Sequence, residues 1–144
     1  MLAACAAMAV SLLGAAPSGL AQTPDINGQC VANLKTEGSF MAGRRWKTSV
    51  DLPSGTQGGV VTSLGQSLAT DGHWKNIQAS KDIGTITAVQ DIPPGTKQMP
   101  LSIVVKSAAS GVTVEAILTT PPMIAASAKG VQDMVCKLLV GAGG

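Results

Sequence analysis

The stretch from Val60 to Val89 constrains the fold most, because a helix pattern is followed there by two strand patterns. Apolar residues recur at helical spacing and share one stripe of a helix: Val60, Val61, Leu64 and Leu68. Gly72 ends this helix, since glycine adopts the left-handed conformation past a helix end without steric cost. Residues 73–77 and 85–89 then favour strands, with a turn over residues 81–84 between them.

A strand pattern from Ser39 to Leu52 precedes this unit. Alternate positions are apolar in one set (Phe40, Ala42, Trp46, Val50 and Leu52) and polar in the other (Arg45, Lys47, Ser49 and Asp51). Arg44 breaks the alternation, which indicates a bulge or a strand end nearby. Thr56 is a suitable N-cap for the helix that follows.

Two alternating runs and a second helix complete the chain. After a turn over residues 90–95, the runs place apolar residues at every second position: Met99, Leu101, Ile103 and Val105, then Val112, Val114, Ala116 and Leu118. Pro121 and Pro122 suit the first turn of a helix with Thr120 as its cap. That helix has one apolar stripe: Ile124, Ala128, Val131, Val135 and Leu138.

These elements predict an α+β fold, with a small antiparallel sheet of four to five strands and two helices packed on one face. We expect a single domain over residues 39–140. A polar, turn-prone entry arm over residues 22–38 precedes it, and a frayed tail over residues 141–144 follows it.

The first residues have the composition of a secretory signal. Residues 2–16 are apolar or small apart from one serine, and Pro17 and Gly19 follow them. We therefore expect a signal peptide over residues 1–21, cleaved before Gln22. A membrane-spanning helix is the alternative, but the run is short for the roughly 20 apolar residues that a bilayer needs. No Lys or Arg precedes the run, so either the true start lies upstream of Met1 or the signal is atypical.

Cysteine usage agrees with export. The mature chain would keep Cys30 and Cys136, and an exported chain with two remaining thiols most simply joins them in a disulfide. Cys5 would leave with the signal peptide. The segment Leu2–Cys5 also has the form of a lipoprotein processing box, so a lipid anchor on Cys5 is the alternative.

Composition argues against several chemistries. The net charge of +2 is too small for the basic stripe typical of nucleic-acid binders, and one Phe, two Trp and no Tyr leave little for base stacking. His73 is the one histidine, and the sequence offers no third group to orient it as a catalytic base, so we expect a solvated or capping residue. Neither a metal-ligand cluster nor a cofactor motif is present, and we expect no metal, no cofactor and no catalysis.

Two short motifs are candidate binding sites. Gly58 and Gly59 lie between a strand and a helix, where backbone N–H groups can hold an anion, although a plain loop explains them more simply. The densest charge cluster is Arg44, Arg45, Trp46 and Lys47, which could meet lipid headgroups, anionic glycans or an acidic protein face. The simpler interpretation places Trp46 in the core and the charges on the solvent side of the same strand.

One stretch resembles a known family. Its residues are Leu64, Leu68, Gly72, Trp74, Ile77, Asp82, Gly84 and Ile86. This pattern is similar to small periplasmic domains of helix-grip type, such as those of the outer-membrane-assembly lipoprotein BamC. The resemblance implies a non-enzymatic module of the cell envelope.

The function we predict is that of a non-catalytic, exported periplasmic or secreted protein that binds an envelope protein or the envelope surface. The strand edge around Arg45 and the open sheet face are its candidate contact elements. Two alternatives stay open. One is a binder of a small apolar ligand in a cleft between the sheet and the final helix. The other is a secreted inhibitor of a hydrolase.

Overall fold

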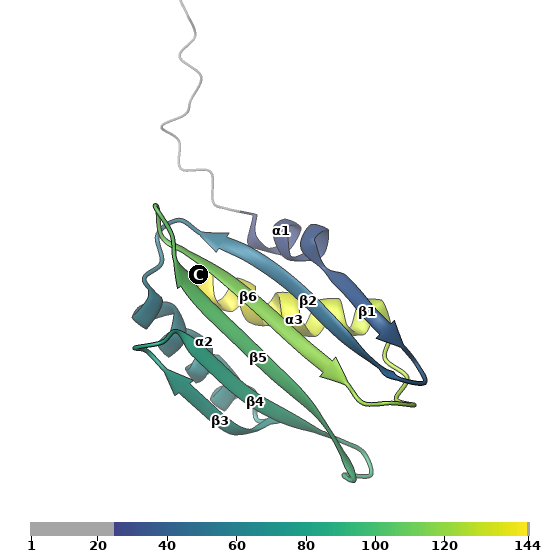
Figure 1. Cartoon of the computed structure of the whole chain (residues 1–144). Coiled ribbons are helices and arrows are strands. Elements are labelled where there is room, and N and C mark those ends of the chain that lie inside the picture. The colour runs from purple at the N-terminus through teal and green to yellow at the C-terminus, as the bar shows by residue number, and fades with distance from the viewer. Residues whose placement is uncertain (1–24, 144) are drawn as a thin grey trace, which may run out of the picture.

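The computed structural model describes residues 25–143, which are built around a six-stranded antiparallel sheet (Figure 1). The strand order across the sheet is β1-β2-β6-β5-β4-β3. The predicted signal peptide (residues 1–21), with Cys5, lies outside the described residues. The strands are β1 (Lys35–Ser39), β2 (Gly43–Leu52), β3 (Trp74–Ser80), β4 (Thr85–Ile92), β5 (Lys97–Ser107) and β6 (Val112–Thr120).

Three helices cover one face of this sheet: α1 (Ile26–Asn33), α2 (Gln57–Asp71) and α3 (Ala128–Gly143). Helix α1 packs on β2 and α3, whereas α2 packs on β3 and α3. The inward side chains of neighbouring strands lie in register, as Leu118 does with Trp46 and Leu101, and they form one core with the helices. The α+β class and the packing of helices on one sheet face are therefore confirmed.

The sequence pattern placed α2 correctly. Thr56 caps its start, and the Thr56 hydroxyl accepts a hydrogen bond from the Gly59 N–H at 3.2 Å. Gly72 ends it in the left-handed conformation with φ 78°. The predicted apolar stripe is buried in full: Val60, Val61, Leu64 and Leu68. A single amphipathic face and two clear caps made this helix predictable.

The predicted entry arm is wrong, because residues 26–39 form helix α1 and strand β1. The Asp25 carboxylate caps α1 by accepting a hydrogen bond from the Gly28 N–H at 2.8 Å. Only Ile26 and Cys30 of this helix are buried, and every residue of the edge strand β1 is exposed. Short elements with so little buried surface have no hydrophobic periodicity, and for this reason the sequence pattern did not predict α1 and β1. The sheet therefore has six strands rather than the predicted four to five, and the fold has three helices rather than two.

The predicted strand from Ser39 is also shorter than expected. Residues 40–42 form the turn between β1 and β2, and Phe40 is exposed there rather than part of the core. The apolar alternation of β2 begins only at Trp46. Arg44 breaks the sequence pattern and is the second residue of β2, so the predicted strand end near it is confirmed.

The final helix begins later than predicted. Thr120 pairs with Arg44 as the last residue of β6, so it does not cap a helix, and Ile124 lies in the linker. Helix α3 is capped instead by Ser127, whose hydroxyl accepts a hydrogen bond from the Gly130 N–H at 3.0 Å. Its fully buried stripe is Val131, Val135, Cys136 and Leu139. The helix continues to Gly143, so residues 141–143 are not a frayed tail.

The predicted disulfide is present in the structure. Cys30 of α1 and Cys136 of α3 are joined by an S–S bond of 2.06 Å across a separation of 106 residues. Both cysteines are buried in the core. The bridge therefore ties the first helix to the last, on the covered side of the sheet.

Candidate functional site

The predicted contact cluster does not form one surface. Trp46 is only 2% exposed, and its indole N–H donates to the Thr120 hydroxyl at 3.4 Å, so this residue is part of the core. The Arg44 guanidinium lies 6.0 Å from the centroid of the Trp46 ring. Arg45 and Lys47 lie on the opposite, open face, where Lys47 pairs with Glu115 at 3.4 Å. Arg45 and Lys47 are exposed and Arg44 is partly exposed, whereas Trp46 is buried and cannot contact a partner at the surface.

A different cluster of apolar residues is exposed at the end of the sheet next to these cations. Phe40 and Met41, in the β1–β2 turn, are 41% and 68% exposed, and Met123, in the β6–α3 linker, is 59% exposed. The two segments lie side by side, because the Met123 N–H donates to the Phe40 carbonyl at 2.7 Å (Figure 1). We call Phe40, Met41 and Met123 the apolar tip.

Three basic residues lie next to the two segments that form the apolar tip. Arg44 and Arg45 directly follow the turn that holds Phe40 and Met41. The Lys97 ammonium reaches the linker on the other side, where it donates to the Pro122 carbonyl at 3.0 Å. Glu37 is opposite Arg45 in the ladder, but no ion pair within 4.0 Å joins them. Exposed apolar groups and cations therefore share one end of the sheet.

The backbone of Met123 is unusual for its residue type. Its φ of 65° lies in the left-handed region, which Asn and Gly tolerate but which is unfavourable for bulky side chains. The side chain is exposed, so burial does not offset that unfavourable conformation. Only weak sequence signals could have located the tip. Phe40 and Met41 lie shortly before a glycine, and Met123 directly follows two prolines.

A groove of about 700 Å³ lies between α2, α3 and β4. Trp74, Met134 and Leu138 form its apolar part, whereas the α2 side is polar, and Lys137 lines it as well. A smaller hollow of about 240 Å³ continues it along α3, because Gln90 and Met134 line both. The Gln90 side-chain carbonyl oxygen is buried, and within residues 25–143 it has no hydrogen-bond partner. We call the two hollows together the helical groove.

His73 lies at the rim of the helical groove, just beyond the end of α2. Its Nδ1 atom is 3.1 Å from the Asp71 carboxylate, and both side chains are largely exposed. The imidazole and the carboxylate face solvent together. This is the geometry of a surface pair at a helix end, close to the solvated or capping role that we expected for His73.

The predicted anion site at Gly58 and Gly59 is the first turn of α2. The Gly59 N–H is occupied by the Thr56 hydroxyl, and a Cβ at Gly58 would meet open space. Gly59 thus takes part in the capping of the helix, and Gly58 belongs to its first turn. An anion there remains a prediction.

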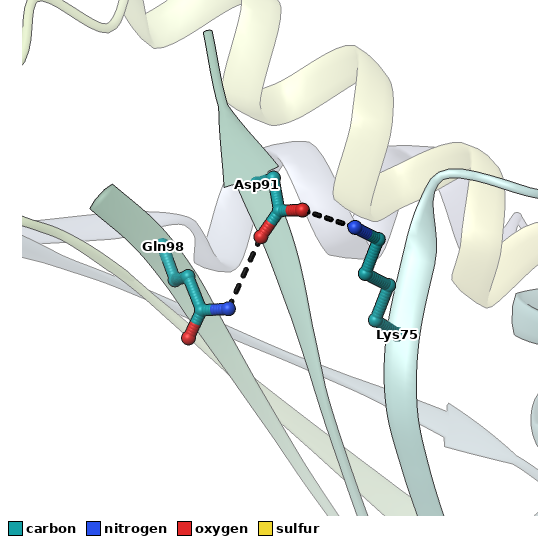
Figure 2. Close-up of polar contacts among 3 residues, drawn as sticks. All are labelled: Lys75, Asp91 and Gln98. Carbon is teal, nitrogen blue, oxygen red and sulfur yellow. Dashed lines mark hydrogen bonds and ion pairs between the residues drawn. The ribbon is translucent and has the colours of Figure 1, made fainter. Parts of the chain in front are cut away.

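Three polar side chains form a cluster where β3, β4 and β5 lie side by side (Figure 2). The Asp91 carboxylate accepts hydrogen bonds from the Lys75 ammonium and from the Gln98 amide, the latter at 3.1 Å. The hydrogen bond from Lys75, followed by that from Gln98, lowers the pKa of Asp91 below its ordinary value. The cluster therefore stabilises the outer strands while Asp91 is ionised.

This cluster predicts an acid-sensitive contribution to stability. Because the folded-state pKa of Asp91 is lowered, its contribution is complete above the unfolded-state value of about 4 and is lost as the pH falls through the folded-state value. We expect Asp91→Asn to lower the free energy of unfolding at neutral pH, and we expect the difference from wild type to vanish at low pH. Urea unfolding at a series of pH values measures this. Asp82→Asn, in the exposed β3–β4 turn, is the matched control, and an equal trend in that variant would contradict the assignment.

Comparison with known proteins gives no family for this chain. Neither a scan against protein-family models nor a search of curated proteins finds a match. Within residues 25–143, no helix is both long and apolar enough to cross a membrane. The same residues contain no group of three or more His, Cys, Asp or Glu side chains placed to hold a metal ion.

Proposed function

We propose that the protein is a non-catalytic, exported binding module of the cell envelope, which attaches to an anionic membrane surface through its apolar tip. Apolar side chains of the tip would enter the interface between headgroups and acyl chains. The cations beside them, Arg44, Arg45 and Lys97, would face anionic headgroups. Such a combination of a few apolar side chains with basic neighbours is typical of peripheral membrane contact.

The observation that most supports this proposal is the conformation of Met123. The left-handed conformation of this bulky residue is unfavourable, and its exposed side chain gains no burial that would offset the cost. Stability of the isolated protein therefore does not explain a methionine at this position. Contact with an apolar environment outside the protein explains it, because that contact would remove the side chain from water.

The size of the tip favours a membrane over a protein partner. A standard protein interface buries about 800 Å² on each side and includes 20–30 residues, roughly. The apolar tip consists of Phe40, Met41 and Met123 at the end of two connecting segments. A lipid interface accepts so small an apolar projection, since each inserted side chain gains burial without a complementary surface.

Three further observations support export to the envelope. The predicted signal peptide over residues 1–21 would direct the chain out of the cytosol. The Cys30–Cys136 disulfide suits an oxidising compartment. The resemblance to periplasmic helix-grip domains points to the same compartment, and its residues fall on α2 and its C-cap, β3, the β3–β4 turn and β4.

Vesicle sedimentation tests the proposed function. We expect the mature protein to bind vesicles of phosphatidylcholine and phosphatidylglycerol more tightly than pure phosphatidylcholine, and to lose affinity as the salt concentration rises. The double variant Phe40→Ser/Met41→Ser should bind these vesicles at least about tenfold more weakly, because it removes much of the inserted apolar surface. Ile83→Ser is the matched control, since Ile83 is as exposed as Met41 but lies in the β3–β4 turn.

Met123→Asn separates the effect of this residue on folding stability from its effect on membrane binding. Asn tolerates the left-handed conformation, so we expect the free energy of unfolding to rise by about 1 kcal/mol while vesicle affinity falls. Urea unfolding and sedimentation measure the two changes on one sample. The proposal would be contradicted if Ile83→Ser lost as much vesicle affinity as the tip variants, or if both tip variants bound vesicles as the wild type does. Vesicle-independent capture by an envelope protein through the same tip would contradict the choice of a membrane.

A further inference from the structure

We propose that Met41 and Met123 are an oxidant-sensitive modification site, and that conversion of their thioethers to sulfoxides by a peroxide detaches the apolar tip from the membrane. This inference rests on the proposed function, because it concerns the regulation of the same contact. It goes further in assigning a covalent modification to two residues of the tip, which membrane attachment alone does not require.

The two most exposed methionines among the described residues both lie in the apolar tip. Met41 is 68% exposed and Met123 is 59% exposed, whereas Met99 and Met134 are partly buried against the core. The turn that holds Met41 and the linker that holds Met123 lie side by side, since the Met123 N–H donates to the Phe40 carbonyl. Two methionines from distant parts of the sequence therefore present their sulfur atoms at one end of the sheet.

The cysteine sulfur atoms do not compete for an oxidant. Cys30 and Cys136 are joined in the disulfide and are buried, so neither offers a free thiol. Susceptibility of a methionine to oxidation follows its exposure to solvent. A peroxide that reaches the protein from solution would therefore react first with Met41 and Met123.

Oxidation changes the polarity of the tip without changing its charge. The methionine sulfur donates an electron pair to one peroxide oxygen, so that an S–O bond forms as the O–O bond breaks. The sulfur is thereby oxidised to the sulfoxide, and the leaving hydroxide takes up the proton of the transferred oxygen and departs as water. The sulfoxide is polar and accepts hydrogen bonds from water. To enter the apolar part of a membrane, it would have to lose those hydrogen bonds.

The positions of the four methionines separate membrane binding from folding. Sulfoxides at Met41 and Met123 would stay largely in water in the free protein, because both side chains are exposed. Sulfoxides at Met99 and Met134 would instead place a polar group against the core. We therefore expect oxidation of the tip alone to weaken membrane binding and to leave the free energy of unfolding nearly unchanged.

Peroxide treatment followed by vesicle sedimentation tests this inference. With dilute hydrogen peroxide, peptide mass spectrometry should show Met41 and Met123 oxidising about fivefold faster than Met99 and Met134. The protein oxidised at the tip should bind vesicles that contain phosphatidylglycerol about tenfold more weakly than the untreated protein. Urea unfolding should give the same stability before and after treatment. Methionine sulfoxide reductases for both sulfoxide epimers should restore vesicle binding.

Two double variants assign the loss of binding to particular sulfur atoms. Met41→Leu/Met123→Leu keeps apolar side chains of similar size but has no sulfur at the tip, so it should bind vesicles equally before and after peroxide. Met99→Leu/Met134→Leu is the matched control. It removes the same number of sulfur atoms elsewhere, and its vesicle binding should stay as sensitive to peroxide as that of the wild type.

Three results would overturn the modification site while leaving membrane attachment intact. They are equal oxidation rates at all four methionines, unchanged vesicle binding after complete oxidation of Met41 and Met123, and an equal loss of binding in Met41→Leu/Met123→Leu. A different result, absence of vesicle binding before any peroxide is added, would contradict the proposed function itself, and the modification would then have no membrane contact to regulate.

Discussion

Replacing Cys30 and Cys136 together by alanine should lower the free energy of unfolding by about 4.7 kcal/mol. The bridge closes a loop of more than a hundred residues, for which chain entropy gives about this value because the cross-link restricts the unfolded chain. Small domains are stable by only about 5–15 kcal/mol, so the loss is a large share of the total. Urea unfolding of the oxidised wild type and the double variant measures it.

Reduction provides the matched control. A thiol reductant should destabilise the wild type by a similar amount and leave the double variant unchanged, since that variant has no bridge to break. Alanine is preferable to serine at these positions, because both sites are buried and a serine hydroxyl would lack a partner there. A loss below about 1 kcal/mol would show that the bridge contributes little beyond the packing of α1 on α3.

The second large effect is expected from a pair of neighbours on β6. Leu118 is fully buried under the helices, whereas Ile117 lies on the open face of the same strand. Leu118→Ala should lower the free energy of unfolding by about 3 kcal/mol, the sum of lost burial and a cavity in the core. Ile117→Ala removes a side chain of similar size and should cost about 1 kcal/mol or less. Urea or thermal unfolding of the two variants compares the faces directly.

A loss of stability in Ile117→Ala as large as that in Leu118→Ala, or larger, would contradict a core on one face of the sheet. If Ile117→Ala were as damaging as Leu118→Ala, the open face would have to be covered by something in solution. Equal and small effects would indicate that the helices do not pack on the central strands. The paired design removes differences in strand position, since the two residues are adjacent in β6.

Elements with a regular hydrophobic pattern could be predicted from the sequence. In β5 and β6 every second residue faces the helices, so apolar side chains alternate along both strands. In α2 the buried residues follow helical spacing between a threonine cap and a glycine stop. The disulfide was predictable as well, because export would leave two cysteines.

The missed elements have little buried surface or depend on distant pairing. Strand β1 is exposed along its length and exists because β2 offers it a ladder, which no local pattern reveals. The start of α3 was misplaced because Thr120 stays in the sheet through its pairing with β2. Both functional candidates have the same character. The apolar tip requires the Phe40 and Met123 segments to meet, and the main hollow of the helical groove requires four separate elements.

The most direct measurement of the proposed membrane contact uses the methionine methyl groups as depth markers. Met41, Met99, Met123 and Met134 are spread over the tip, the start of β5 and the groove. With phosphatidylglycerol nanodiscs whose acyl chains have a nitroxide label, we expect strong broadening of the Met41 and Met123 signals and little change at Met99 and Met134. Unbroadened Met41 and Met123 signals, or equal broadening of all four, would contradict attachment through the tip.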